Sequence, residues 1–181
     1  MRSKFLLGLV VCLNIWACGS EPDLSVLSTL RGEGGLSYVE SKSKWSELKN
    51  QNGNSYTYQT TFQSWVGFGH TTEIKVKDGV VVARSYQEFS IDQRTGKRTV
   101  TDTYQEEGSE LGIHEIGAEL LTIDELYTAC STSFLIVNQE DNTLYFETAD
   151  NGLMTTCGYV PNGCVDDCYR GIRINAFEWD E

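Results

Sequence analysis

The sequence predicts an α+β fold, in which an antiparallel sheet of six to seven strands has two helices packed on one face. Most of the chain after residue 55 consists of segments that alternate polar and apolar side chains, and short glycine-containing turns separate them. Two other segments repeat apolar residues at the spacing of one helix face. The 181 residues, less a short N-terminal segment, provide one domain of ordinary size.

The first helix is predicted over Val39–Lys49. Trp45 and Leu48 are three residues apart and Tyr38 precedes Trp45 by seven, so the three side chains share one face. Gly53 follows, and glycine is common just beyond the end of a helix.

Four strands joined by short turns are predicted next, as an antiparallel meander. In the first strand Tyr56, Tyr58, Thr60 and Phe62 lie on one face, and polar residues lie on the other. Asp78-Gly79 indicates a two-residue hairpin turn, because both residue types tolerate positive φ. The four strands are expected at residues 55–66, 72–77, 80–89 and 99–104.

The second helix is predicted to begin at Thr122. Thr122 and Glu125 have the spacing of a capping box, in which each side chain satisfies the backbone amide of the other residue. The apolar face of this helix consists of Ile123, Leu126, Tyr127 and Cys130. Three strands then close the domain, at residues 143–149, 153–159 and 169–179.

The N-terminus has the pattern of an export signal. Arg2 and Lys4 precede the apolar stretch Phe5–Trp16, which is short for a transmembrane helix, and the small residue Ala17 follows. The residues that end at Cys18 also resemble a bacterial lipobox, whose cysteine becomes the lipidated first residue of the mature protein. We predict a signal peptide at residues 1–17, a lipidated N-terminus and tether at residues 18–37, and one globular domain at residues 38–181.

The signal pattern and the lipobox together predict a location on the extracytoplasmic side of the cell envelope, at the outer membrane or the periplasmic face. The expected partner there is the membrane itself, through a lipid anchor such as palmitate on Cys18, and the fallback is a plain secreted protein. The formal net charge is −12, and removal of residues 1–17 leaves −14, because the signal carries two basic residues and no acid. Nucleic acid is excluded as a partner, since its phosphates would be repelled.

Four cysteines remain after the signal and the lipidation site, and an even number in an exported protein predicts disulfides. Cys157 could pair with Cys168, which leaves Cys130 for Cys164. Cys164 could instead close on Cys168, which leaves Cys130 to meet Cys157. The place of Cys130 on the apolar helix face favours the second arrangement. The spacings do not form the paired knuckles of a zinc module, so no metal is expected.

The order of these motifs resembles a family of small exported bacterial lipoproteins known only as a domain of unknown function. The resemblance rests on Trp45 in the first helix, Tyr56-Thr57-Tyr58, the hairpin around Asp78-Gly79-Val80-Val81, the Thr122–Tyr127 helix and Leu144-x-Phe146. It would cover about residues 40–178. Family members often carry a cysteine pair in the first hairpin, where this chain has Ser64-Trp65-Val66-Gly67. The resemblance implies an α+β fold and an envelope location, and no activity.

No catalytic residue is predicted. His70 and His114 are the only histidines, no nucleophile elbow accompanies them, and no cofactor-binding pattern is present. Residues 105–119 are expected to form an acidic surface loop with solvated carboxylates. Asp166-Asp167 is the exception among the acidic pairs, because Cys164 and Cys168 flank it and would fix its loop.

Trp65 and Phe68 are the candidate binding residues. They fall at the break between the first two strands of the meander, where Trp65 leaves the face formed by Tyr56, Tyr58 and Phe62. Such rings either cover one end of the sheet or form a recognition edge. Our first hypothesis is a non-catalytic binding or structural module for a protein or envelope component. The alternative is a secreted acid-dependent hydrolase built on paired carboxylates.

Overall fold

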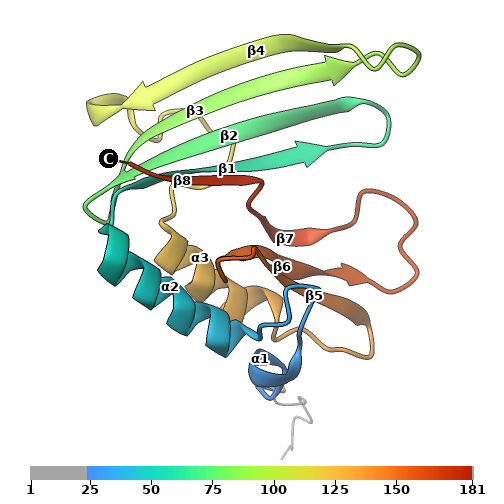
Figure 1. Ribbon diagram of the computed structural model, residues 1–181. Coiled ribbons are helices and arrows are strands. Elements are labelled where there is room, and N and C mark those ends of the chain that lie inside the picture. The colour runs from blue at the N-terminus through green and yellow to red at the C-terminus, as the bar shows by residue number, and fades with distance from the viewer. Residues whose placement is uncertain (1–23, 181) are drawn as a thin grey trace, which may run out of the picture.

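The computed structural model describes residues 24–180, which form two antiparallel sheets and three α-helices (Figure 1). The helices are α1 (Val26–Thr29), α2 (Tyr38–Asn52) and α3 (Ile123–Ala129). A 3-10 turn covers Gly108–Glu110, and a π-helical turn, Cys130–Phe134, continues α3. The strands are β1 (Tyr56–Gln63), β2 (Phe68–Lys77), β3 (Val80–Ile91), β4 (Arg98–Glu107), β5 (Asn142–Thr148), β6 (Met154–Pro161), β7 (Arg170–Arg173) and β8 (Ala176–Trp179).

The larger sheet has the strand order β4-β3-β2-β1-β8, and the smaller has the order β5-β6-β7. All the strand pairs are antiparallel, so the mixed α and β composition and the antiparallel pairing are confirmed. The prediction of a single sheet of six to seven strands is wrong, because the eight strands of the described residues are divided between a five-stranded and a three-stranded sheet. In Figure 1, α2 and α3 lie on one side of the larger sheet, next to the smaller one.

The meander from β1 to β4 matches the prediction. Asp78 and Gly79 connect β2 to β3 with φ values of 51° and 80°, which is the positive-φ pair that a tight hairpin turn requires. At the next turn, the Asp92 carboxylate accepts hydrogen bonds from the backbone amides of Arg94 and Thr95 at 2.9 and 2.8 Å. These local bonds explain why the turns were recognisable from the sequence.

The predicted last strand is divided into β7 and β8, which belong to different sheets. The amide of Ile174 donates to Thr155 O of β6 at 2.7 Å, whereas the next amide, that of Asn175, donates to Gln59 O of β1 at 2.8 Å. The Asn175 side chain also accepts from the amide of Thr61 at 2.6 Å. The chain therefore changes sheets between two successive residues and holds the two sheets together at this point.

Both longer helices begin at capping boxes. Thr122 and Glu125 form the predicted box of α3, and Ser37 and Glu40 form a second box that starts α2 at Tyr38. The structure thus confirms both helices and places the start of α2 one residue earlier than expected.

The core lies between the inner face of the larger sheet, the helices and the smaller sheet. Trp45 of α2 is 1% exposed and packs edge-on against Tyr56 of β1, with ring centroids 5.3 Å apart. The Tyr127 hydroxyl of α3 lies 2.6 Å from Ser41 Oγ of α2 and accepts from the amide of Met154 of β6 at 2.9 Å. One buried hydroxyl therefore links both helices to the smaller sheet.

Packed structure extends into the segment expected to be a tether. Val26 of α1 is 4% exposed and belongs to the core, and Leu27 and Leu30 pack against it. The proposed signal peptide and the lipidation site at Cys18 lie outside the described residues. Within residues 24–180, no helix is both long and apolar enough to cross a bilayer.

The acidic segment after the meander differs from the prediction. We expected a solvated loop from residue 105, but β4 continues to Glu107 and places Glu106 on the inner face of the sheet, beside Tyr104. Glu106 is 1% exposed. The expectation of solvation is therefore wrong for Glu106, because a buried arginine stabilises its charge.

Candidate functional site

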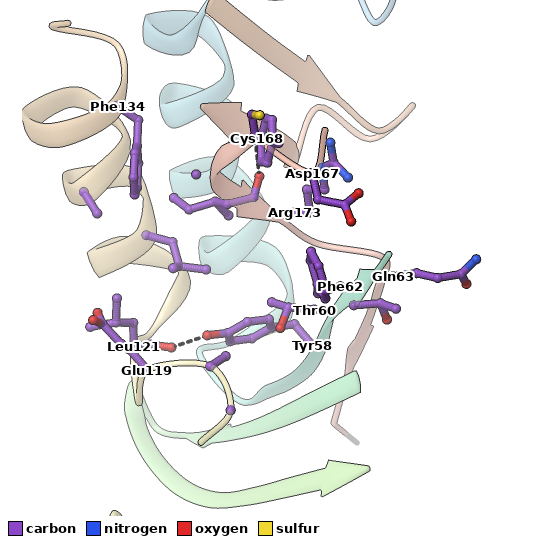
Figure 2. A pocket seen from close by; sticks show the side chains of 18 of the residues that line it. Tyr58, Thr60, Phe62, Gln63, Glu119, Leu121, Phe134, Asp167, Cys168 and Arg173 are labelled. Carbon is purple, nitrogen blue, oxygen red and sulfur yellow. Dashed lines mark hydrogen bonds between the residues drawn. The ribbon is translucent and has the colours of Figure 1, made fainter. Parts of the chain in front are cut away.

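A cleft of about 620 Å³ opens where the two sheets meet (Figure 2). Its walls come from β1, from the loop that precedes α3, from α3 with its π-helical turn, and from β6 and β7. In Figure 2, Glu119 and Leu121 lie at one side of the cleft, Asp167 and Arg173 at the other, and Tyr58 between them. This volume falls within the range of small-molecule sites, about 300–1,000 Å³.

The interior of the cleft is mainly apolar. Its apolar walls consist of Leu121, Leu126, Ala129, Phe134, Val160 and Ile172. Two tyrosines complete them, and both already use their hydroxyl hydrogens within the protein. Tyr58 donates to Leu121 O at 2.6 Å, and Tyr169 donates to Ile172 O at 2.9 Å. Burial raises the pKa of Tyr169 to about 12 and that of Tyr58 further. These phenols therefore offer aromatic surface and not acid–base chemistry.

Charged groups lie at the rim of the cleft. Glu119, Asp166 and Asp167 supply three carboxylates, and Arg173 supplies one guanidinium group, which lies over the Tyr169 ring at 4.0 Å. No group in the part of the chain that the structure describes pairs with the Glu119 carboxylate. The rim is therefore acidic, like the protein as a whole.

The predicted recognition edge is exposed and held in place. Trp65 is 70% exposed and Phe68 is 53% exposed. The indole Nε1 of Trp65 donates to Asp166 at 2.5 Å, and Ser64 Oγ donates to Asp167 at 2.5 Å, so the β1–β2 turn is fastened to the loop between β6 and β7. The turn closes tightly because Gly67 has φ of 92°, and a Cβ there would lie 2.6 Å from Ile91 O. The edge thus borders the cleft through the two aspartates that line both.

The cysteines pair in the second of the two arrangements considered from the sequence. Cys130 pairs with Cys157, with Cα atoms 5.8 Å apart, and Cys164 pairs with Cys168, with Cα atoms 6.3 Å apart. The first bridge is buried and joins the π-helical turn after α3 to β6. The second closes the exposed loop that carries the two aspartates. That loop is the one expected to be fixed by its flanking cysteines, and its carboxylates contact the recognition edge.

A second polar cluster surrounds Glu106 and meets the loop that forms one wall of the cleft. Its carboxylate accepts from Arg84 Nε at 2.9 Å, from the amide of Gly112 at 2.9 Å and from the amide of His114 at 2.7 Å, and it lies 2.7 Å from His114 Nδ1. Arg84 also donates to the carbonyls of His114 and Ala118. The cluster therefore fastens the loop before α3 onto the sheet.

The pKa of Glu106 results from opposing effects. Burial raises the pKa, but the hydrogen bonds from Arg84, Gly112 and His114 outweigh burial and hold it at about 2. Glu106 is therefore ionised at neutral pH, and it orients the His114 imidazole through a contact with Nδ1 at the edge of the ring.

A row of neighbouring rings, stacked except for the tilted pair Phe68 and Phe62, runs across the inner face of the larger sheet, with successive ring centroids between 4.0 and 6.1 Å apart. In order, the rings are Phe68, Phe62, His70, Tyr86, Tyr104 and His114. The row carries Phe68 of the recognition edge at one end and the Glu106 cluster at the other. Burial lowers the pKa of His70, so this imidazole is neutral at pH 7.

Sequence reasoning missed the cleft and the Glu106 cluster. The cluster had a detectable signal, because continued alternation from Tyr104 places Glu106 on the same face. The cleft had none, because its walls come from segments far apart in the chain. Among residues 24–180, no group of three or more histidine, cysteine or carboxylate side chains is arranged to hold a metal.

Comparison with protein-family models, with curated proteins and with solved structures finds no match to this chain. The resemblance to the exported lipoprotein family stays a prediction, and the function is argued from the site itself.

Proposed function

We propose that this protein is a bacterial envelope lipoprotein, anchored by a lipid on Cys18 at the outer membrane or the periplasmic face, that acts as a non-catalytic binding module. Its partner is a protein or another component of the envelope. The export pattern at the N-terminus supports the location. Two disulfides in the described domain suit an oxidising compartment outside the cytoplasm.

The observation that carries the binding role is the fixed, exposed edge of Trp65 and Phe68. Large rings that remain in water are unusual unless a partner covers them, and tryptophan is enriched among the residues that dominate interface energies. The hydrogen bond from Trp65 to Asp166 ties the indole to a disulfide-closed loop. Little conformational entropy would then be lost when the edge binds, which favours affinity.

The test compares wild type with Trp65→Ala/Phe68→Ala. The partner is first captured from detergent-solubilised envelopes and identified, and its affinity for purified wild type and variant is then measured by calorimetry. We expect at least a tenfold loss of affinity, since truncation of a central interface ring costs about 2 kcal/mol or more. The melting temperature should stay nearly unchanged, because both rings are already exposed to water.

Val80→Ala/Val100→Ala is the matched control, because these side chains are 63% and 47% exposed and lie away from the edge. It should change neither affinity nor melting temperature. A large loss of stability in the Trp65/Phe68 variant would show that the rings cover the end of the sheet, and unchanged affinity would end the recognition hypothesis.

The anchor has its own test. Cys18→Ser should release the protein from the membrane fraction, while the wild-type mature N-terminus should be an acylated Cys18 when analysed by mass spectrometry. A mature wild-type N-terminus at any other residue would instead support the plain secreted form.

A secreted hydrolase is the second candidate, and the Glu106–His114 contact is the observation that favours it. A carboxylate that orients a histidine ring is a common part of hydrolytic sites, although such sites also need a nucleophile beside the ring. His114→Ala and His70→Ala should both leave any activity unchanged under the binding proposal. Loss of turnover in either variant would favour the hydrolase.

A further inference from the structure

We infer that the cleft between the two sheets binds a small amphiphile with an apolar chain and a cationic end group. This inference rests on the proposed binding role and adds a ligand class to it. The chain would lie along Leu121, Leu126, Phe134 and Ile172, and the end group would lie at the acidic rim.

The apolar part follows from the chemistry of the walls. Aliphatic and aromatic side chains form most of the interior, and the hydroxyls of Tyr58 and Tyr169 donate to backbone carbonyls of Leu121 and Ile172. A polar ligand would therefore find few free donors inside the cleft and would lose its hydrogen bonds to water on entry. An apolar chain loses no such bonds and removes apolar wall surface from water, at roughly 25 cal/mol per Å².

The cationic end follows from charge complementarity at the rim. Asp166 and Asp167 each accept one side-chain hydrogen bond from the recognition edge, and Arg173 lies over the Tyr169 ring. Glu119 is exposed, and nothing within residues 24–180 pairs with its carboxylate. Arg173 and the two aspartates lie at the side of the cleft opposite Glu119, so the Glu119 side of the rim presents a carboxylate that no described residue pairs with and favours a cationic head group over an anionic one.

The test uses three probes that share a dodecyl chain and differ in their head groups: dodecyltrimethylammonium, dodecyl sulfate and dodecyl maltoside. Each is titrated, below its micellar concentration, into the full chain carrying Cys18→Ser in detergent-free buffer, and binding is followed by calorimetry. We expect saturable binding with one site per chain, and the ammonium probe should bind most tightly. Its preference should shrink as salt is added, because exposed charges are screened.

Two cleft-filling variants locate the site. Ala129→Phe adds a ring from the helical wall, and Thr60→Phe adds one from the opposite strand, so a folding defect in one variant leaves the other informative. Each folded variant should lose saturable binding of all three probes. If both fold and still bind as wild type does, the cleft is not the site.

Glu119→Gln tests the charge without changing the shape of the side chain. It should weaken binding of the ammonium probe by about fivefold, the size expected from one exposed charge pair, and leave the maltoside unchanged. Glu115→Gln removes a carboxylate from the same loop outside the cleft, and it should change the affinity for neither the ammonium probe nor the maltoside. Tighter binding of the sulfate than of the ammonium probe, or no saturable binding of any probe, would overturn the inference.

The test of the amphiphile inference and the test of the proposed function can fail independently of each other. Trp65→Ala/Phe68→Ala reports on the recognition edge, and the cleft-filling variants report on the interior. If the edge variant loses its partner while no probe enters the cleft, the binding role stands and the amphiphile inference fails. If probes bind the cleft but the Trp65→Ala/Phe68→Ala variant keeps its affinity for the partner, the recognition hypothesis fails and the amphiphile inference stands.

Discussion

Arg84→Met removes the buried ion pair that holds the loop before α3, together with the two hydrogen bonds from Arg84 to the carbonyls of His114 and Ala118. In the wild type, the side chains of Arg84 and Glu106 are 5% and 0% exposed and meet at 2.9 Å. The substitution keeps an apolar stem of similar length and removes the charge. It leaves an ionised carboxylate buried, with three remaining donors from Gly112 and His114.

Breaking a buried pair by removing one partner costs about 3–5 kcal/mol in free energy of unfolding. The three remaining donors place the expected cost for Arg84→Met at the lower end, about 3 kcal/mol. Arg31→Met is the matched control, because it makes the same substitution in an exposed pair with Glu40, whose side chains are 43% and 47% exposed. The control should cost clearly less than Arg84→Met, because solvent screens an exposed pair.

Urea denaturation of both variants measures these values, provided that the slope against denaturant stays constant. A third variant, Arg84→Met/Glu106→Leu, removes both charges and should be destabilised by less than the sum of the two single substitutions. If Arg84→Met and Arg31→Met cost the same, burial does not set the strength of this pair and the reasoning fails.

Three further outcomes are expected. Hydrogen bonds depress the pKa of Glu106 from 4.5 to about 2, so the stability that Glu106 contributes is complete above pH 4.5 and is lost as the pH falls toward 2. The free energy of unfolding of Glu106→Gln should therefore depend less on pH in this window than that of the wild type. Equal pH dependence of the two proteins would contradict this prediction. Mild reductant should open the exposed Cys164–Cys168 bridge before the buried Cys130–Cys157 bridge. Thiol labelling followed by mass spectrometry measures the order, and the reverse order would be evidence against the difference in exposure between the two bridges. Replacing both cysteines of a bridge by serine should cost about 2 kcal/mol for the short loop and about 3.5 kcal/mol for the long one; equal costs by urea denaturation would refute the loop-length argument.

The sequence alone was sufficient wherever a feature depends on nearby residues. The capping box at Thr122 joins positions three apart, and the turn at Asp78-Gly79 depends on the φ preferences of those two residues. The shared faces of β1 and α2 followed from periodicity, and Tyr56, Tyr58 and Trp45 of those faces are buried. Such features use short-range bonds and steric preferences that a tertiary environment rarely overrides.

The sequence left open whether Trp65 and Phe68 cover one end of the sheet or form an exposed edge, and in the structure they are 70% and 53% exposed. What holds Trp65 was not foreseeable, because Asp166 lies 101 positions further along the chain. The acidic loop shows the same limit. Composition favoured solvation of every carboxylate, yet one of them, Glu106, is buried because Arg84 of the neighbouring strand faces it.

The division of the strands between two sheets was decided by tertiary structure alone. Over residues 169–179 the apolar positions change phase between Ile174 and Phe177, which indicates a break but does not indicate which strand each half pairs with. The change of sheet at Ile174 and Asn175 depends on which backbone carbonyls lie within hydrogen-bonding distance, those of Thr155 and Gln59. Pairing partners are set by the three-dimensional course of the chain, and the cleft exists because that course keeps the two sheets apart.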